Sequence, residues 1–249
     1  MSDIKGIILA GGTGSRLYPL TRVTNKHLLP VGREPMLYHP LRKLVEAGID
    51  EILVVTGVEH MGAVVGSLGS GREFGCELTY RVQDEAGGIA QALALARHFA
   101  AGSRMVVLLG DNLFEDPLAP FLARYAAQPA GAQILLKQVE QPGRFGVPAF
   151  ADGRIVRIDE KPEQPASDYA VTGIYFFDAQ VFELIARLKP SRRNELEITD
   201  VNNFYLQQGL LEYDMLSGWW TDAGTFESLA HANQLVNGQS DGQSVGLGG

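Results

Sequence analysis

Cysteine is almost absent from this sequence of 249 residues, which contains only Cys76. A single thiol excludes an intrachain disulfide and any metal site built from several cysteines. No apolar run approaches the ~18 residues of a membrane-spanning helix. The apolar stretch at 7–10 is also too short for a signal peptide. We therefore expect a cytoplasmic protein without a membrane partner.

Positive charge is also scarce, because 21 lysines and arginines face 29 aspartates and glutamates, for a net charge of −8. Such an acidic surface argues against broad binding to nucleic acid, but not against a small anion held by a few placed cations. Several catalytic signatures are missing as well. The sequence has no Walker loop and no H-E-x-x-H, and its five histidines show no metal-ligand spacing.

Glycine, in contrast, is abundant. The sequence contains 29 glycines, which is about 12% of the residues against a usual ~7%. The segment 237–249 holds five of them in 13 residues, and we expect it to be a flexible tail that buries little. The other glycines are scattered among periodic segments, so each needs a local explanation.

The chain changes in texture near its middle. As far as about residue 139, buried-strand patterns such as Ile4–Ala10 alternate with helical patterns, such as those after Pro35 and at 89–99. This alternation predicts an α/β fold with a mostly parallel central sheet and helices on both faces. Short strands then follow one another before a last helix at 226–236. We expect one domain, 1–236, with halves that meet at about residues 139 and 140.

A glycine-rich turn, LAGGTGSRL at residues 9–17, follows the first strand directly. Glycines let several backbone N–H groups approach a phosphate, and Arg16 adds a cation beside them. The dinucleotide fingerprint is excluded because Leu17 stands where its third glycine or alanine belongs. The alternative is a tight turn without a ligand. Lys26 could neutralise a second phosphate, although a lone lysine is most often a solvated surface residue.

Two aspartates occur where strands end. Asp111 follows the apolar strand 105–109, and Asp222 lies within GWWTDAGT at 218–225. Carboxylates beside phosphates suit Mg²⁺, which usually takes only one or two ligands from the protein. Each aspartate could instead cap the helix that follows it. The pair Glu160-Lys161 could bind hydroxyls and a phosphate, or form a solvated ion pair.

Taken together and in this order, the motifs resemble those of sugar-1-phosphate nucleotidyltransferases, most closely the glucose-1-phosphate thymidylyltransferases. The similarity runs from about residue 5 to residue 236. It is sharpest at LAGGTGSRLYPLT, KHLLPVGREPM, VQDEAGGIAQA, LGDN, EKP, YAVTGIYFFD, ELEITDVNNFYL and GWWTDAGT. The resemblance implies a Rossmann-like nucleotide-diphospho-sugar transferase fold, with a smaller sugar-binding β part after the nucleotide-binding half. It also implies a homo-oligomer, either a dimer or a tetramer.

The resemblance further implies that dTTP binds to the first half of the chain. Arg16 and Lys26 would hold the β- and γ-phosphates, and Gln83 together with the backbone of Gly87 and Gly88 would read the edge of the pyrimidine. The rest of the nucleotide site would consist of Leu9, Gly11, Gly12, Thr13, Gly14 and Asp111. Asp111 and Asp222 would hold the Mg²⁺ cofactor at the α-phosphate.

Glucose 1-phosphate would bind to the second half, with its phosphate on Lys161. The residues implied around the sugar are Asn112, Phe145, Gly146, Glu160, Val171, Thr172 and Trp220. The attacking phosphate oxygen is already anionic, so the reaction needs positioning, cations and a metal rather than a general base. Catalysis would therefore depend on Arg16, Lys26, Asp111, Lys161 and Asp222.

Three alternatives stay open. The first is the same chemistry with UTP or with another hexose 1-phosphate, since a pocket gains only ~1–3 kcal/mol from a methyl group. The second is a sensor of nucleotide sugars without catalytic activity, which would not need five charged site residues. The third is an NAD-linked oxidoreductase, which Leu17 disfavours.

Overall fold

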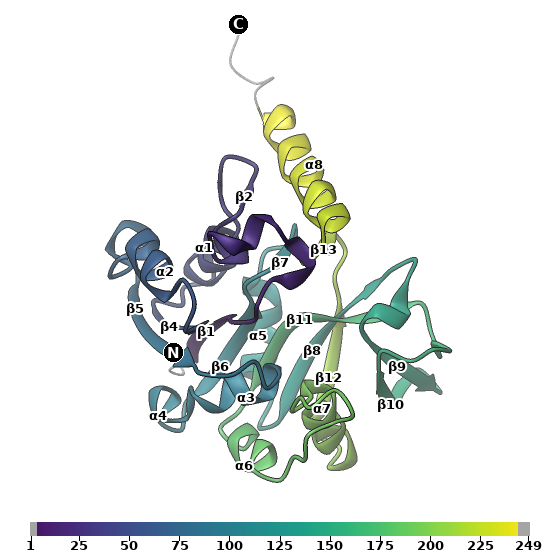
Figure 1. Ribbon diagram of the computed structural model, residues 1–249. Helices are drawn as coiled ribbons and strands as arrows, with labels where there is room; N and C mark the ends of the chain where they lie inside the picture. Colours follow the sequence, from purple (N-terminus) through teal and green to yellow (C-terminus); the bar gives the residue numbers. More distant parts are fainter. Residues whose placement is uncertain (1–3, 244–249) are drawn as a thin grey trace, which may run out of the picture.

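A mixed β-sheet forms the centre of the structure, a computed structural model that describes residues 4–243 (Figure 1). Within these residues nine strands join in one sheet of order β10-β9-β11-β6-β1-β4-β5, with β8 paired to β11 and β12 paired to β8. These strands are β1 Ile4–Ala10, β4 Glu51–Gly57, β5 Glu77–Gln83, β6 Arg104–Leu109, β8 Ala132–Gln138, β9 Gly146–Ala151, β10 Arg154–Glu160, β11 Tyr169–Phe177 and β12 Leu211–Met215. Strands β6, β1, β4 and β5 run parallel, and β11 joins β6 antiparallel.

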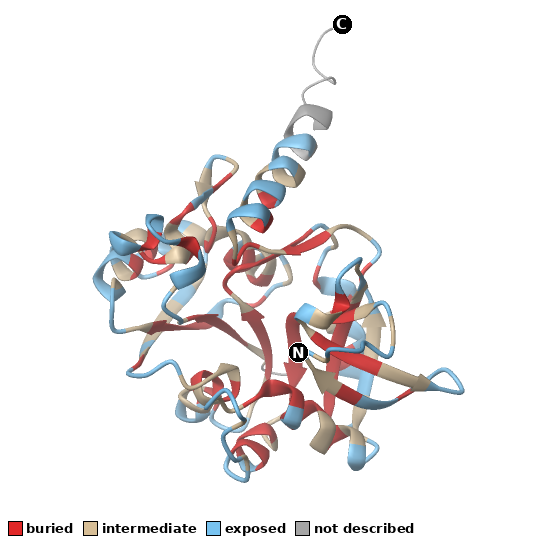
Figure 2. Ribbon diagram, turned by 45° about the vertical axis from the view of Figure 1, so that its right-hand side comes forward, coloured by how far each residue is buried: buried red, intermediate tan, exposed pale blue. Residues whose placement is uncertain are grey.

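Helices cover both faces of this sheet. They are α1 Tyr38–Glu46, α2 Met61–Leu68, α3 Ile89–Ala94, α4 Arg97–Ala100, α5 Ala119–Ala127, α6 Val181–Ile185, α7 Ile198–Gln207 and α8 Phe226–Gln243. In β1, Ile7 and Leu9 pack with residues of α3, α6 and α7, whereas Ile8 and Ala10 pack with residues of α1, α2 and α5. Successive strand residues point to opposite faces, so two cores flank the sheet. Figure 2 colours long stretches of the central strands as buried. The expected α/β fold is confirmed.

Two short strand pairs lie outside the main sheet. β2 (Pro30–Val31) pairs with β3 (Glu34–Pro35), and β7 (Asn112–Phe114) pairs with β13 (Trp220–Asp222). The second pair brings together two chain segments that lie far apart in the sequence. Strands of two or three residues carry no usable periodicity, so the sequence patterns did not reveal them. The single-turn 3₁₀-helices are η1 Ser15–Leu17, η2 Leu20–Arg22, η3 Lys26–Leu28, η4 Arg72–Phe74 and η5 Pro142–Arg144.

Two helix predictions need correction. Pro35 does not open a helix, because it lies in β3 and the N–H of the following Met36 donates to the carbonyl of Leu29. Helix α1 begins only at Tyr38. The predicted helix 89–99 is divided into α3 and α4. Ala96 and Ala100 are fully buried and continue the apolar stripe across the break, so periodicity could not locate it.

The last helix, α8, extends beyond the predicted segment 226–236 and projects from the body of the molecule (Figures 1 and 2). It continues through Gly238, although a glycine inside a helix costs about 1 kcal/mol relative to alanine. Residues 244–249 of the expected flexible tail lie outside the described residues. None of the helices in the part of the chain that the structure describes has the length and apolar character to cross a membrane.

Candidate active site

A cleft of about 570 Å³ opens beside the carboxyl ends of the parallel strands. The chain passes from β1 outward to β4 and β5 on one side, whereas β6 lies on the other side of β1. The loops that follow β1 and β6 therefore diverge, and open α/β sheets bind ligands in such a crevice. The expected site residues that line it are Leu9, Gly11, Gly12, Arg16, Lys26, Gln83, Gly88, Asp111, Asn112, Phe145, Gly146, Glu160, Lys161, Val171, Trp220 and Asp222.

The glycine-rich loop after β1 is anchored from within. Gly12 (φ 94°) and Gly14 (φ 61°) have positive φ angles that favour glycine. The carbonyl of Gly14 accepts hydrogen bonds from the Leu17 N–H at 2.9 Å and from Thr21 Oγ1 at 2.7 Å. Leu17 is fully buried beneath the loop. The backbone therefore stays open towards the cleft, and Arg16 remains exposed at its rim.

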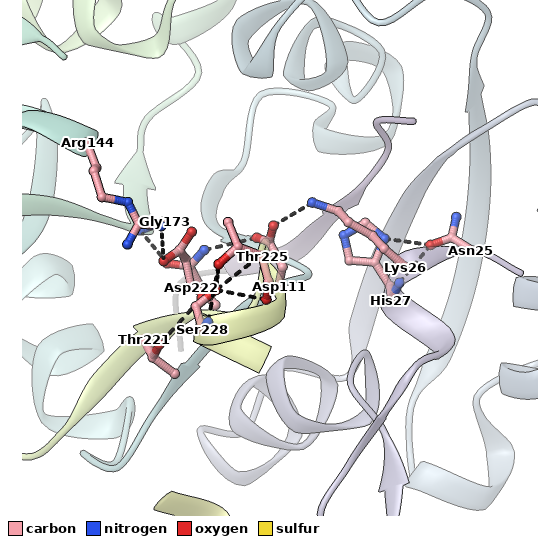
Figure 3. Close-up of polar contacts among 11 residues, drawn as sticks. Asn25, Lys26, His27, Asp111, Arg144, Gly173, Thr221, Asp222, Thr225 and Ser228 are labelled. Carbon is pink, nitrogen blue, oxygen red and sulfur yellow. Dashed lines mark hydrogen bonds and ion pairs between the residues drawn. The ribbon is translucent and has the colours of Figure 1, made fainter. Parts of the chain in front are cut away.

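Lys26 and Asp111 form a buried ion pair on the floor of the cleft. The distance from Lys26 Nζ to Asp111 Oδ2 is 2.5 Å, and Asn112 Nδ2 donates to Asp111 Oδ1 at 3.1 Å (Figure 3). Burial alone would raise the pKa of Asp111, but Lys26, with smaller help from His27 and Asn112, holds it well below its usual range. Asp111 is therefore an anion at any working pH, and Lys26 is already neutralised before a substrate binds.

Asp222 faces the same space from β13. The Ala223 N–H donates to the carbonyl of Asp111 at 2.8 Å, so the two aspartates lie on adjacent backbone segments. Arg144 approaches from η5, with its Nη2 at 3.6 Å from Asp222 Oδ1 (Figure 3). Burial and then repulsion from Asp111 raise the pKa of Asp222, against the opposing charges of Arg144 and Arg16. The cleft therefore holds two carboxylates, and an added cation would reduce the repulsion between them.

The two carboxylates fit a divalent cation that brings further ligands with it. Within residues 4–243, no group of three or more His, Cys, Asp and Glu side chains is placed to hold a metal ion. Mg²⁺ needs hard oxygen ligands and usually keeps one or two carboxylates while phosphates and water complete its shell. Asp111 and Asp222 match that chemistry, and a phosphate ligand must supply the rest.

His27 lies beneath this pair and is structural. It is 1% exposed, and both its backbone N–H (2.9 Å) and its ring Nδ1 (2.7 Å) contact Asn25 Oδ1. Burial and the neighbouring Lys26 lower the pKa of His27 to about 3. An imidazole with so low a pKa is a weak base, and its burial keeps it away from a substrate, so His27 is a poor general base for a reaction in the cleft.

Glu160 lies at the centre of a hydrogen-bonded network on the second half of the cleft. Thr199 Oγ1 donates to Glu160 Oε2 at 2.6 Å, and Arg193 Nη2 donates to Glu160 Oε1 at 3.0 Å. Arg193 also donates to Glu197 at 2.7 Å. Lys161 Nζ lies 3.7 Å from Glu160 Oε1, and its backbone N–H donates to the carbonyl of Phe145. The carboxylate is thus fixed in place, with lone pairs left to accept from a ligand.

An aromatic wall closes the cleft between its two halves. The rings of Phe145 and Trp220 meet edge to face with centroids 5.1 Å apart. Asn112 Oδ1 accepts hydrogen bonds from Trp220 Nε1 at 2.8 Å and from the Gly173 N–H at 2.9 Å. Asn112 is 3% exposed, so its main role is to link Trp220 to β11 through these two hydrogen bonds.

Four expected residues do not line the cleft. Thr172 is fully buried and donates to the carbonyl of Leu135 at 2.9 Å, on the side of the neighbouring strand. Successive side chains of a strand point to opposite faces, so the side chain of Thr172 points away from the cleft that Val171 lines. The Gly87 N–H donates to Gln91 Oε1, and the Gly87 carbonyl accepts a hydrogen bond from the N–H of Leu196. Thr13 and Gly14 belong to the loop after β1 but not to the lining.

Comparison with known proteins agrees with this geometry. The family model described as nucleotidyl transferase matches residues 5–239. The chain belongs to the nucleotidyl transferase family. The glucose-1-phosphate thymidylyltransferase of Neisseria meningitidis is 46% identical over 237 residues, which cover 94% of this chain and 82% of the relative. Its counterpart in Xanthomonas campestris is 43% identical over 240 residues, or 95% and 81% of the two chains.

Solved structures show the same family likeness. A Bacillus anthracis protein, solved with sucrose under the name glucose-1-phosphate thymidylyltransferase, superposes with a TM-score of 0.90 at 59% identity and covers 93% of this chain and 94% of its own. A UDP-glucose pyrophosphorylase solved with UDP-glucose superposes with a TM-score of 0.84 at 23% identity, covering 95% of this chain and 99% of its own, which supports the fold. This nucleotidyltransferase therefore has the nucleotide-diphospho-sugar transferase fold that was expected.

The nucleotidyltransferase cleft also contains residues that the sequence patterns did not single out. They are Tyr175, Arg144, Arg193, Glu195, Glu197 and Thr199. Glu195, Glu197 and Thr199 lie within the segment ELEITD, which was noted only for its resemblance, and Arg193 precedes that segment. An arginine with acidic and polar side chains around the start of a helix was a usable signal. Arg144 offered none, because a lone arginine in a turn is usually a surface residue.

Proposed function

We propose that this nucleotidyltransferase transfers the thymidylyl group of dTTP to α-D-glucose 1-phosphate, which yields dTDP-glucose and pyrophosphate. One observation carries the proposal. A single cleft combines a glycine-rich loop and two cations with a fixed carboxylate and Lys161, and it holds Asp111 and Asp222 as well. The names of the relatives at 46% and 43% identity support this pair of substrates.

The nucleotide binds beside the loop after β1, with Arg16 and Lys26 on its β- and γ-phosphates. Lys26 is bound to Asp111 in this structure, so the phosphates must replace that carboxylate as its partner. Asp111 and Asp222 would hold Mg²⁺, and the bound metal supplies positive charge at the α-phosphate. With Asp111 and Asp222 holding such a cation, Lys26 would no longer be needed as the counter-charge of Asp111 and could pair with a phosphate.

Glucose 1-phosphate binds on the other side, with its phosphate at Lys161 and its hydroxyls at Glu160. Phe145 and Trp220 form an apolar wall against the sugar ring. The nucleophile is a phosphate oxygen that is already anionic and needs no base, and His27 in the lining is buried and has a pKa lowered to about 3, which makes it weakly basic. The residues of the cleft therefore act by orienting two anions for in-line attack and by stabilising the charge that develops.

Release of pyrophosphate tests this proposal directly. The purified chain is incubated with each pairing of dTTP, UTP, dCTP, ATP or GTP with glucose, galactose, mannose or N-acetylglucosamine 1-phosphate, with and without Mg²⁺. We expect the highest kcat/KM for dTTP with glucose 1-phosphate, and turnover only with the metal. A preference for UTP or another sugar would support the first alternative. Binding of dTDP-glucose without any turnover would support a sensor.

The metal assignment has its own test. Asp111→Asn and Asp222→Asn should each lower kcat by at least about 100-fold, because each substitution replaces an anionic ligand of the metal by a neutral amide. Both variants should keep the circular dichroism spectrum of the wild type. Asp50→Asn is the matched control, because Asp50 is exposed and lies at the opposite end of the parallel strands, before β4. Unchanged turnover in either cleft variant would refute the assignment.

A further inference from the structure

Gln91 stands at the start of α3, and its side chain folds back over the loop that precedes this helix. Gln91 Oε1 accepts two hydrogen bonds, one from the Gly87 N–H at 2.9 Å and one from Gln83 Nε2 at 2.8 Å. The amide of Gln91 lies so close to Gly87 that a Cβ on this glycine would meet it within 2.5 Å. Gly87 therefore leaves space for Gln91, and its own N–H is not available to a ligand.

These contacts determine the orientation of two side-chain amides. A backbone N–H can only donate, so the atom of Gln91 that faces Gly87 must be the oxygen. The same oxygen faces Gln83, which must therefore present its NH₂ group to Gln91. The carbonyl of Gly88, at 3.4 Å from Gln83 Nε2, requires the same orientation. If the Gln83 amide flipped, its oxygen would face two acceptors without an intervening proton.

The other end of the Gln83 amide is consequently an acceptor that faces the cleft. Gln83 Oε1 lies 2.5 Å from the place that a Cβ of Gly11 would occupy, and both residues line the cleft. Among residues 4–243, no protein group donates a hydrogen bond to this oxygen. The N–H of Gly88, also in the lining, has no protein acceptor in the same part of the chain. One unpaired acceptor and one unpaired donor, from residues that are in contact with each other, therefore belong to the lining of the same cleft.

We propose that Gln91 is a positioning residue that fixes the polarity of this pair and thereby selects the nucleobase. Uracil and thymine present N3–H beside the C4 carbonyl, which complements an acceptor beside a donor. Cytosine presents a bare N3 beside an amino group, so it places acceptor against acceptor and donor against donor. A methyl group forms no hydrogen bond, so this pair does not distinguish thymine from uracil. It separates both of these bases from cytosine. This inference rests on the proposed nucleotide substrate.

The test compares the ratio of kcat/KM for dTTP to that for dCTP, at saturating glucose 1-phosphate. Gln91→Met keeps the length of the side chain and removes its acceptor, and this ratio should fall by about 10-fold or more, because the Gln83 amide becomes free to flip. Gln91→Glu keeps an acceptor for both donors and should retain the ratio within about 3-fold. Gln234→Leu, at an exposed position of α8, is the matched control and should change nothing.

A merely structural role for Gln91 predicts another pattern. In that case Gln91→Met would lower kcat/KM for dTTP and dCTP equally and leave the ratio unchanged, which would overturn the inference. Loss of the ratio in Gln91→Glu with a wild-type melting temperature would overturn it as well. This second variant keeps the test valid if Gln91→Met does not fold.

Failure of the proposed function can be recognised separately. If the wild type released no pyrophosphate from dTTP and glucose 1-phosphate, the proposed function would be wrong. The binding constants of dTTP and dCTP, measured by calorimetry on wild type, Gln91→Glu and Gln91→Met, would then decide the inference. A dTTP preference kept by both proteins and lost in Gln91→Met supports it, and equal binding of the two nucleotides by the wild type overturns it.

Discussion

Acidification should destabilise this fold through the side chain of His27. Burial, followed by the charge of Lys26, lowers the pKa of His27 to about 3. Histidine in an unfolded chain has a pKa of about 6.5. Between these values the unfolded state binds a proton that the folded state does not. The contribution of His27 to stability is therefore complete above the unfolded pKa and is lost as the pH falls from about 6.5 towards 3.

The size of the effect follows from these two pKa values. The free energy of unfolding should decrease by up to about 1.4 kcal/mol per pH unit, and by about 2 kcal/mol in total between pH 8 and pH 5. The structure explains why the ring stays neutral. Asn25 Oδ1 accepts from the backbone N–H of His27, so the ring Nδ1 must be the donor to that same oxygen. The neutral ring already makes this contact, and a second proton would add charge to a buried site beside Lys26.

Urea unfolding at pH 8, 7, 6 and 5 measures the effect, with wild type and His27→Gln compared at each pH. Glutamine can still donate to Asn25 but does not titrate. The stability difference between the two proteins should change by about 2 kcal/mol from pH 8 to pH 5, to the disadvantage of the wild type. His39, whose pKa burial also lowers, acts equally in both proteins and cancels. Parallel pH profiles would refute the reasoning.

Four further predictions concern the cleft and the assembly. Arg144→Ala removes the cation at 3.6 Å from Asp222, so the protein without substrate should bind Mn²⁺ about 2–5-fold more tightly in calorimetry. Thr199→Val removes the donor to Glu160 and should raise the KM for glucose 1-phosphate about 10-fold with little change in kcat. Gly88→Ala places a Cβ at 2.6 Å from a backbone carbonyl with φ at 99°, and calorimetric melting should fall by about 4–8 °C. Light scattering should show a dimer or a tetramer, and a monomer at micromolar concentration would contradict this.

Much of the fold could be predicted because its central strands are buried on both faces. β1 coincides with the predicted Ile4–Ala10, since the continuous apolar residues 7–10 before two glycines are typical of a central strand that is buried on both faces. What failed was short or interrupted structure. The pair β7–β13 owes its existence to tertiary contact, since each strand has three residues. Pro35 shows another limit, because a short local hairpin with Pro30 and Val31 holds it in β3, and strands of two residues carry no periodicity.

The site could be predicted where a residue type and its place at a strand end both pointed to an anion or a metal. Asp111, at the end of a central buried strand, is such a case. Thr172 and Gly87 were misplaced because motif resemblance does not tell which face of a strand a side chain takes, or whether a backbone N–H is already used. Arg144 was missed because its importance arises from Asp222, a distant carboxylate that only folding brings near. Arg193 has local partners in Glu195 and Glu197, but its contact with Glu160 also depends on folding.

The charges of the cleft explain how an acidic chain can receive two anionic substrates. Lys26 is paired with Asp111, Arg144 with Asp222, and Arg193 with Glu160 and Glu197. These cations are neutralised in advance, which limits their repulsion and keeps them ordered in a low-dielectric site. Substrate phosphates can then replace the carboxylates as partners, and a metal ion can take the carboxylates that are released. Substrate binding is therefore an exchange of ionic partners. The cleft does not need a surplus of positive charge, and the net charge of −8 on the whole chain does not prevent binding.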